Sequence, residues 1–239
     1  MKTPWQIVLC SLSLALSGSS CETVQSTDIK TSSLYAELEA DAPGTGRVNV
    51  KATLRLGPGS LTFLELTPGE LLTATVGPTN RAMSRQAVLG TTSYEAGFDG
   101  DGDGEGTPVK VSLSRVSDTS APESVATLPA AFVFTAPTAN TTVPRTGGLI
   151  VSWSGTGPAD PMHISARGSC IQPVDAEATG ASGTHTFAAF KIATGNETNT
   201  CNLVITLVRT RIGVVDPAYG KGGVFKASVT RTLNLSSTP

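Results

Sequence analysis

The stretch best suited to binding a metal ion alternates acidic residues with glycine. Carboxylates occupy every second position, at Asp99, Asp101, Asp103 and Glu105. Carboxylate oxygens on a flexible backbone can wrap a hard cation such as Ca²⁺, and the first half matches a D-x-D-x-D-G calcium loop. The twelfth position, where an EF-hand carries a bidentate Glu, is Lys110, so an EF-hand is excluded. Two interpretations remain: a calcium loop at a hairpin tip that needs further ligands, and a solvated acidic turn.

A second candidate site is the polar, glycine-containing segment 209–224. Arg211, Tyr219 and Lys221 lie in it. Long loops on a rigid scaffold often carry binding residues, and Tyr and Arg are favoured anchors at protein interfaces. The segment therefore predicts a binding surface for a protein or glycan partner. The alternative is a hairpin connection whose glycines only permit tight bends.

Two cysteines in the C-terminal half suggest a covalent cross-link. Cys201 alternates in step with Leu203 and therefore faces the core, which favours a disulfide to Cys170 in an oxidising compartment. A zinc site that adds His163 and His185 is the rival interpretation. It lacks the closely spaced ligand pair that structural zinc sites use.

The sequence contains none of the local motifs that mark common catalytic centres. There is no G-x-S-x-G nucleophile elbow, no H-E-x-x-H and no phosphate-binding glycine loop that opens a helix. We therefore expect a protein that is not an enzyme. A hydrolase, or the accessory subunit of one, stays open as an alternative because two distant carboxyls are enough for glycoside hydrolysis.

The N-terminus resembles a bacterial export signal. Lys2 precedes an apolar run over residues 7–16, which is shorter than the roughly 20 residues that span a bilayer. Small residues at 18–20 then lead to Cys21, as in a lipoprotein box, although Leu16 lies further from the cysteine than usual. We expect residues 1–20 to be removed and Cys21 to carry a lipid anchor in the cell envelope, with the outer membrane as the default. Ordinary cleavage that leaves a secreted protein is the alternative.

Composition excludes some partners. Lys and Arg number 17 and Asp and Glu number 19, so the formal net charge is −2. Such a balance gives no support to nucleic-acid binding.

Strict alternation of apolar and polar residues predicts β-strands with one buried face. The pattern is clear over residues 34–40 and 48–56. Thr67-Pro68-Gly69-Glu70 predicts a type II turn that joins 61–66 and 71–76 as a hairpin. We expect a second hairpin from 94–98 and 109–113, and a helical turn or loop over 81–89.

We expect an all-β fold of two tandem sandwich domains. A flexible tether at 21–33 would precede an N-terminal sandwich at 34–117. A linker at 118–130, which contains Pro122 and Pro129, would lead to a C-terminal sandwich at 131–239.

Several residues carry a family resemblance. The strand Leu149-Ile150-Val151-Ser152-Trp153 is similar to the second strand of fibronectin type III domains, within the immunoglobulin-like class of sandwiches. Together with Tyr94-x-x-x-Phe98, the two cysteines and the 211–223 segment, the chain resembles lipoproteins of Gram-negative envelopes. That resemblance implies a location and an architecture and no activity.

The function these features predict is a non-catalytic, lipid-anchored envelope protein that binds or scaffolds a protein or glycan. The alternatives are a structural envelope protein with a calcium-stabilised loop, and the hydrolase or accessory subunit named above.

Overall fold

The computed structural model of the chain describes residues 22–100, 106–178, 180–189 and 199–239. Regular structure in these residues is β-strand apart from two short 3₁₀ turns, η1 (Ser26–Asp28) and η2 (Thr31–Ser33). No helix in these ranges has the length and apolar character needed to cross a membrane. The predicted all-β fold class is confirmed.

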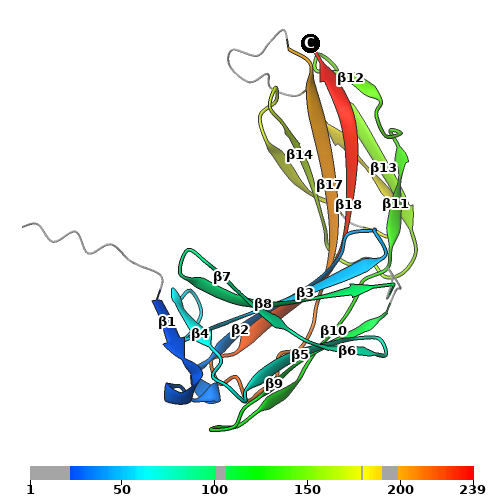
Figure 1. Cartoon of the computed structure of the whole chain (residues 1–239). Helices are drawn as coiled ribbons and strands as arrows, with labels where there is room; N and C mark the ends of the chain where they lie inside the picture. Colours follow the sequence, from blue (N-terminus) through cyan, green and yellow to red (C-terminus); the bar gives the residue numbers. More distant parts are fainter. Residues whose placement is uncertain (1–21, 101–105, 179, 190–198) are drawn as a thin grey trace, which may run out of the picture.

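The strands form three sheets that make two lobes (Figure 1). The largest sheet follows the order β1-β4-β3-β2-β18-β17-β14-β15, with β12, β7 and β8 attached beside it. Its strands are β1 (Glu22–Gln25), β2 (Tyr35–Ala42), β3 (Arg47–Arg55), β4 (Thr62–Glu65), β7 (Ser84–Val88), β8 (Thr91–Asp99), β12 (Thr142–Pro144), β14 (Met162–Gly168), β15 (Val174–Ala178), β17 (Cys201–Ile212) and β18 (Gly223–Thr238).

Two smaller sheets complete the sandwiches. One contains β10 (Ala121–Thr127), β9 (Pro108–Ser114), β5 (Leu71–Val76) and β6 (Thr79–Ala82). The other contains β11 (Phe132–Ala136), β13 (Leu149–Gly155) and β16 (Gly183–Phe187). We call the part built from β1–β10 and the start of β18 the N-terminal lobe, and the remainder the C-terminal lobe.

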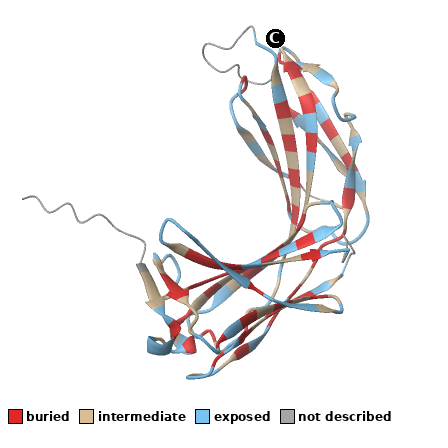
Figure 2. Cartoon of the chain, viewed as in Figure 1, coloured by how far each residue is buried: buried red, intermediate tan, exposed pale blue. Residues whose placement is uncertain are grey.

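Alternating side chains build the core, as the sequence pattern predicts. Ala36, Leu38 and Ala40 of β2 are fully buried, and so are Val109 and Leu113 of β9 on the facing sheet. In Figure 2 the strands show this as bands of buried and exposed residues. Because the side chains of a strand point alternately to its two faces, period-two patterning identifies the buried face correctly.

Both predicted hairpins are wrong, although the turn at 67–70 is present. Glu70 N–H donates to Thr67 O at 3.0 Å, and Gly69 has a φ of +94° as a type II turn requires. The strands on either side, β4 and β5, belong to different sheets. The same is true of β8 and β9, which the sequence also predicts as a hairpin. The connections β4–β5 and β8–β9 therefore cross from one sheet of the sandwich to the other. A sheet must lie on each side of the core to exclude water from it.

The segment 81–89, expected as a helical turn or loop, instead lies in β6 and β7. β7 is exposed along its whole length and pairs with β8. Its lack of a buried face explains why the sequence carries no alternation there.

The predicted tether at 21–33 is also wrong within its described residues. β1 pairs in parallel with β4, and Ser26 and Thr31 are buried. Polar side chains order this segment through hydrogen bonds, which composition alone does not reveal.

The predicted linker at 118–130 contains the strand β10, and Ala121, Ser124 and Ala126 in it are buried. The start of β18, predicted to lie in the C-terminal domain, pairs in parallel with β2 over Gly223–Val229. The two lobes therefore share a sheet. The boundaries at 34–117 and 131–239 stay a prediction about how the chain divides.

Candidate functional site

A buried ion pair forms the centre of an extended hydrogen-bond network in the described part of the N-terminal lobe. Arg115 follows β9, and Glu70 ends the turn between β4 and β5. Arg115 Nε donates to Glu70 Oε1 at 2.7 Å, and the two side chains are 0% and 1% exposed. Because both charges have left water, their stability depends on how fully the remaining donors and acceptors are satisfied.

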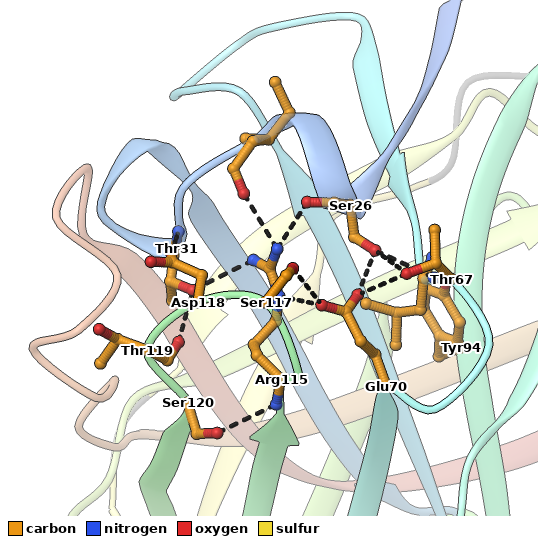
Figure 3. Close-up of polar contacts among 12 residues, drawn as sticks. Ser26, Thr31, Thr67, Glu70, Tyr94, Arg115, Ser117, Asp118, Thr119 and Ser120 are labelled. Carbon is orange, nitrogen blue, oxygen red and sulfur yellow. Dashed lines mark hydrogen bonds and ion pairs between the residues drawn. The ribbon is translucent and has the colours of Figure 1, made fainter.

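The guanidinium of Arg115 uses its other nitrogens to hold the segment after β1 (Figure 3). Nη2 donates to Ser26 O at 2.5 Å and to Ile29 O at 3.0 Å. Nη1 donates to Thr31 Oγ1 at 3.1 Å. One side chain thus fixes both 3₁₀ turns, which explains why a polar segment without large apolar residues is ordered.

The carboxylate of Glu70 is equally well satisfied. Ser26 and Thr67 donate hydroxyl hydrogen bonds to Oε2, and Ser117 donates one to Oε1 at 3.4 Å. Burial by itself would raise the pKa of Glu70, but the hydrogen bonds from Ser26 and Arg115 and the charge of Arg115 outweigh it. The pKa of Glu70 is therefore held below its ordinary value of 4.5.

Asp118 extends this network to the solvent side. It accepts a hydrogen bond from Thr31 N–H at 2.5 Å, and this bond and one from Thr119 hold the pKa of Asp118 below its ordinary value. Thr31 Oγ1 in turn donates to Thr119 O at 2.6 Å. We call Ser26, Thr31, Glu70, Arg115 and Asp118 the buried clamp. Its charged groups are held in hydrogen bonds within the protein, so it is suited to fastening the segment that begins at Glu22.

A hollow lies on the outer face of the N-terminal lobe, over β2, β3, β7 and β8. It has a volume of about 460 Å³, and its charged lining residues are Glu39, Asp41, Arg47, Lys51 and Glu95. Strand register places Lys51 between Glu39 and Glu95, so charges of opposite sign stand side by side. Lys51 and Glu95 lie 3.8 Å apart. The hollow is polar and nearly charge-balanced, a surface that offers hydrogen bonds and carries no strong field.

Of the four acidic residues of the loop, only Asp99 lies within the described ranges. Asp99 is exposed at the end of β8 and forms an ion pair with Arg47 at 3.0 Å. Asp101, Asp103 and Glu105 lie outside the described residues. Among the residues that the structure describes, no group of three or more His, Cys, Asp or Glu side chains could hold a metal ion. Calcium binding by this loop stays a prediction.

The structure does not bring the three predicted binding residues together on a surface. Arg211 lies in β17 and makes two hydrogen bonds to Asp160, at 3.1 and 2.7 Å. Tyr219 is 2% exposed and packs in the core, and burial raises the pKa of its phenol. Lys221 is exposed, while its backbone N–H donates to Leu34 O at 3.2 Å. The expectation of Tyr219 as an accessible anchor is therefore wrong, because its side chain is buried in the hydrophobic core.

The predicted disulfide between Cys170 and Cys201 is confirmed, with an S–S distance of 2.04 Å. The zinc alternative is wrong, because both sulfurs are committed to the bond and His163 lies beside Asp175 and Glu177. Cys21 lies outside the described residues, so its lipidation stays a prediction.

Sequence reasoning missed two buried arginines of the C-terminal lobe. Arg209 is 0% exposed and donates to the carbonyls of Ala130 and Ala181 at 2.8 Å. Arg145 is 2% exposed and donates to Asn199 O at 2.8 Å. Arg209 thus connects β17 to the chain that enters this lobe. Neither residue is marked by a local motif, so the sequence offered no signal for them.

No protein-family model matches this chain, and no curated protein matches it. Among solved structures it is similar to fibronectin(III)-like modules of CbhA from Clostridium thermocellum, at 13% identity and a TM-score of 0.23. That match covers 84% of this chain and 91% of the other. A fragment of titin domains I67–I69 matches at 9% identity and a TM-score of 0.24, over 84% and 63% of the two chains. The adhesin InvE of Yersinia pseudotuberculosis matches at 13% identity and a TM-score of 0.20, over 82% and 58%. At these values none of the similarities carries an argument about activity, ligand or partner.

Proposed function

We propose that this chain is an exported, lipid-anchored envelope protein that acts as a non-catalytic scaffold. In this role the N-terminal lobe sits at the membrane, and the C-terminal lobe is held away from it to meet a protein or glycan partner. One observation carries the proposal: β17 and β18 run as one paired ribbon from the first lobe into the second.

The paired ribbon supports a spacer of fixed length. β17 and β18 are in antiparallel register over twelve residue pairs, from Cys201 opposite Ser237 to Ile212 opposite Lys226. On its other edge, the first part of β18, Gly223–Val229, pairs in parallel with β2. At about 3.3 Å per residue, the 16 residues of β18 extend about 50 Å. Figure 1 shows the chain end at the far tip of the C-terminal lobe.

The start of the folded body supports the position of the anchor. β1 begins at Glu22, one residue after Cys21, and the buried clamp fastens the residues that follow. An acyl chain on Cys21 would therefore hold the N-terminal lobe directly against the bilayer, with no slack between anchor and fold. An orientation set at Cys21 would pass through both lobes along β18.

Mass spectrometry of the protein purified from its host, together with membrane fractionation, tests the anchor. We expect a diacylated N-terminal Cys21 and membrane association that disappears in Cys21→Ala. A matched control is Thr27→Ala, an exposed position in η1 that should leave fractionation unchanged. Unmodified Cys21 in the mature protein would overturn the proposed anchor.

Distance measurements between spin labels on the two lobes test the spacer. Labels at the exposed positions Asn80 of β6 and Thr186 of β16 would report the separation of the lobes. We expect one narrow distance distribution, because both lobes are built on the same strands. A broad or two-peaked distribution would contradict a fixed spacer.

In-cell crosslinking of tagged wild type and Cys21→Ala then tests the scaffold role. We expect one enriched protein or glycan partner that is lost with the anchor. Equal stability of both forms with no enriched partner would contradict a scaffold with a dedicated partner.

A further inference from the structure

One end of the N-terminal lobe carries three exposed apolar side chains, which we call the apolar rim. They are Leu61, Val88 and Leu89, with exposed fractions of 48%, 66% and 95%. Leu61 precedes β4, while Val88 and Leu89 form the tip of the β7–β8 hairpin.

Strand register places the rim beside the start of the folded chain. β1 and β4 are parallel, with Glu22 opposite Thr62, so Leu61 lies just before the level at which β1 begins. Thr62 O accepts a hydrogen bond from Leu56 N–H at 3.3 Å, so the end of β3 lies beside the start of β4. Thr91, at the base of the hairpin tip, lines a small hollow together with Thr53 and Arg55 of β3. In Figure 1 the turn of β7, β4 and the beginning of β1 lie on the same side of the lobe.

The backbone at the hairpin tip is unusual for the residue it carries. Val88 pairs with Thr91, so Leu89 and Gly90 form a two-residue turn, with φ values of +49° and +80°. Turns of this kind favour Asn-Gly, because both central residues need positive φ. Leu89 is strained there, and its side chain is almost fully exposed. Folding therefore gives no reason for leucine at this position, whereas an external apolar contact does.

We propose that the apolar rim seats in the lipid surface to which the chain is anchored. The inference rests on the proposed lipid anchor and deepens it. Cys21 directly precedes Glu22, whose strand begins at the level of the rim, so a lipid on Cys21 would bring the bilayer to Leu61, Val88 and Leu89. Three side chains are far fewer than the roughly 20–30 residues that each partner contributes to a stable protein interface. They suit shallow entry into the region between headgroups and acyl chains.

Tryptophan fluorescence with brominated lipids tests this directly. The mature protein is purified from its host and reconstituted in phosphatidylcholine vesicles with either plain or brominated acyl chains. Leu89→Trp places a reporter at the rim, and Ile150→Trp is the matched control, because Ile150 is 57% exposed on β13 of the other lobe. The native Trp153 is 3% exposed and provides the background. We expect brominated lipid to quench Leu89→Trp and to leave Ile150→Trp at the wild-type level.

The outcomes separate the rim from the anchor. Vesicle-bound protein with acylated Cys21 and an unquenched Leu89→Trp would contradict contact between the apolar rim and lipid. It would leave the proposed lipid anchor unaffected. If Cys21 is unmodified, flotation of the mature protein with vesicles tests the lipid contact of the rim. The contact is supported when wild type and Ile150→Asp float and Leu89→Asp does not. Failure of wild type to float would overturn it.

A further outcome would assign the rim to another occupant, and a second reporter position guards against destabilisation by the first. A concentration-dependent dimer in sedimentation, with Leu89→Trp protected from quenching by brominated lipid, would assign the rim to a second copy of the chain and overturn the proposal. Val88→Trp serves as the second reporter if Leu89→Trp lowers the melting temperature, and the same result is expected from it.

Discussion

The Arg115–Glu70 pair shows how a single contact can hold together parts of the chain that are remote in sequence. Its members are 45 positions apart, and Arg115 also binds Ser26, 89 positions away. Such a pair is stable only while both charges keep their partners, because an isolated buried charge is very costly. The clamp therefore responds to small chemical changes more strongly than ion pairs on the surface do.

Arg115→Met should lower the free energy of unfolding by about 3–5 kcal/mol, because Glu70 is left as a buried, uncompensated charge. Urea denaturation at pH 7 measures the loss. Lys51→Met, which breaks the half-exposed pair with Glu95, is the control and should cost only about 0.2–1 kcal/mol. Equal effects of the two variants would contradict the description of Arg115 and Glu70 as a buried ion pair.

Glu70 should make the protein sensitive to acid. Its pKa is lower in the folded state than the ordinary 4.5, so its stabilising effect is present above pH 4.5 and is lost as the pH falls through the folded pKa. Unfolding free energies of wild type and Glu70→Gln, measured from pH 7 to pH 3, should therefore converge at the acid end. Parallel pH profiles would show that Glu70 binds its proton equally well in both states.

At the scale of single residues, the sequence predicted the disulfide and did not predict the buried ion pair. With the signal removed, Cys170 and Cys201 were the natural pair, and the bond was predictable. Arg115 and Glu70 were invisible, because no local pattern marks partners that meet only after β9 and the 67–70 turn are in place.

At the scale of elements, two connections do different kinds of work. The segment between β17 and β18 is fastened to the fold at two buried residues, with Tyr219 in the core and Asp216 accepting a hydrogen bond from Glu123 N–H at 2.7 Å. The β7–β8 hairpin has a fully exposed first strand and ends in a strained leucine. The segment between β17 and β18 stabilises the fold. The β7–β8 hairpin is destabilised at its tip by the positive φ of Leu89.

Tyr219→Ala should destabilise the protein by about 3–5 kcal/mol, because removing a buried aromatic ring leaves a cavity. Thermal and urea unfolding measure this. Lys221→Ala, two residues further on and exposed, should stay within about 0.5 kcal/mol of wild type. A Tyr219→Ala protein with unchanged melting would restore the interpretation of this tyrosine as a surface anchor.

Leu89→Asn should stabilise the protein by about 1 kcal/mol, because asparagine accepts the positive φ of this turn more readily than leucine does. Urea denaturation again provides the measurement. Val88→Asn should bring no such gain, since the φ of Val88 is not among the positive ones. If Leu89→Asn lowers stability, leucine at this position is explained by a contact within the fold.

The buried face of most strands followed from alternation, and the pairing of strands did not. Thr67-Pro68-Gly69-Glu70 does reverse the chain as predicted, yet it delivers β5 to the opposite sheet. Turn chemistry specifies local dihedral angles. Which strand becomes a neighbour depends on covering both faces of a core assembled from distant residues.

For the whole molecule, the decisive feature is that one sheet serves both lobes. β2 lies between β3 and β18, and β18 contributes the fully buried Phe225, Ala227 and Val229 to the core. Length and composition suggested two separate sandwiches. They carried no sign that the last strand returns to the first lobe, because parallel pairing between segments nearly 190 positions apart leaves no local trace.

A chain truncated after residue 130 should therefore fail to fold cooperatively. It retains the predicted N-terminal domain but loses β18, whose seven paired residues cover β2. Urea unfolding followed by circular dichroism should show a cooperative transition for the full chain and none for the truncated one. A cooperative transition in the truncated chain would show that the predicted domains fold independently.

The shared ribbon also sets how the protein would respond to mechanical force. If a partner pulls on the far tip while the N-terminus is held, tension runs along the axis of β18. The hydrogen bonds from Gly223–Val229 to β2 lie across that direction, so they would be loaded together in shear and would not open one after another. At the other end of the ribbon, the disulfide ties Cys201 of β17 to Cys170. A pull along the chain would thus meet its greatest resistance where the two lobes join.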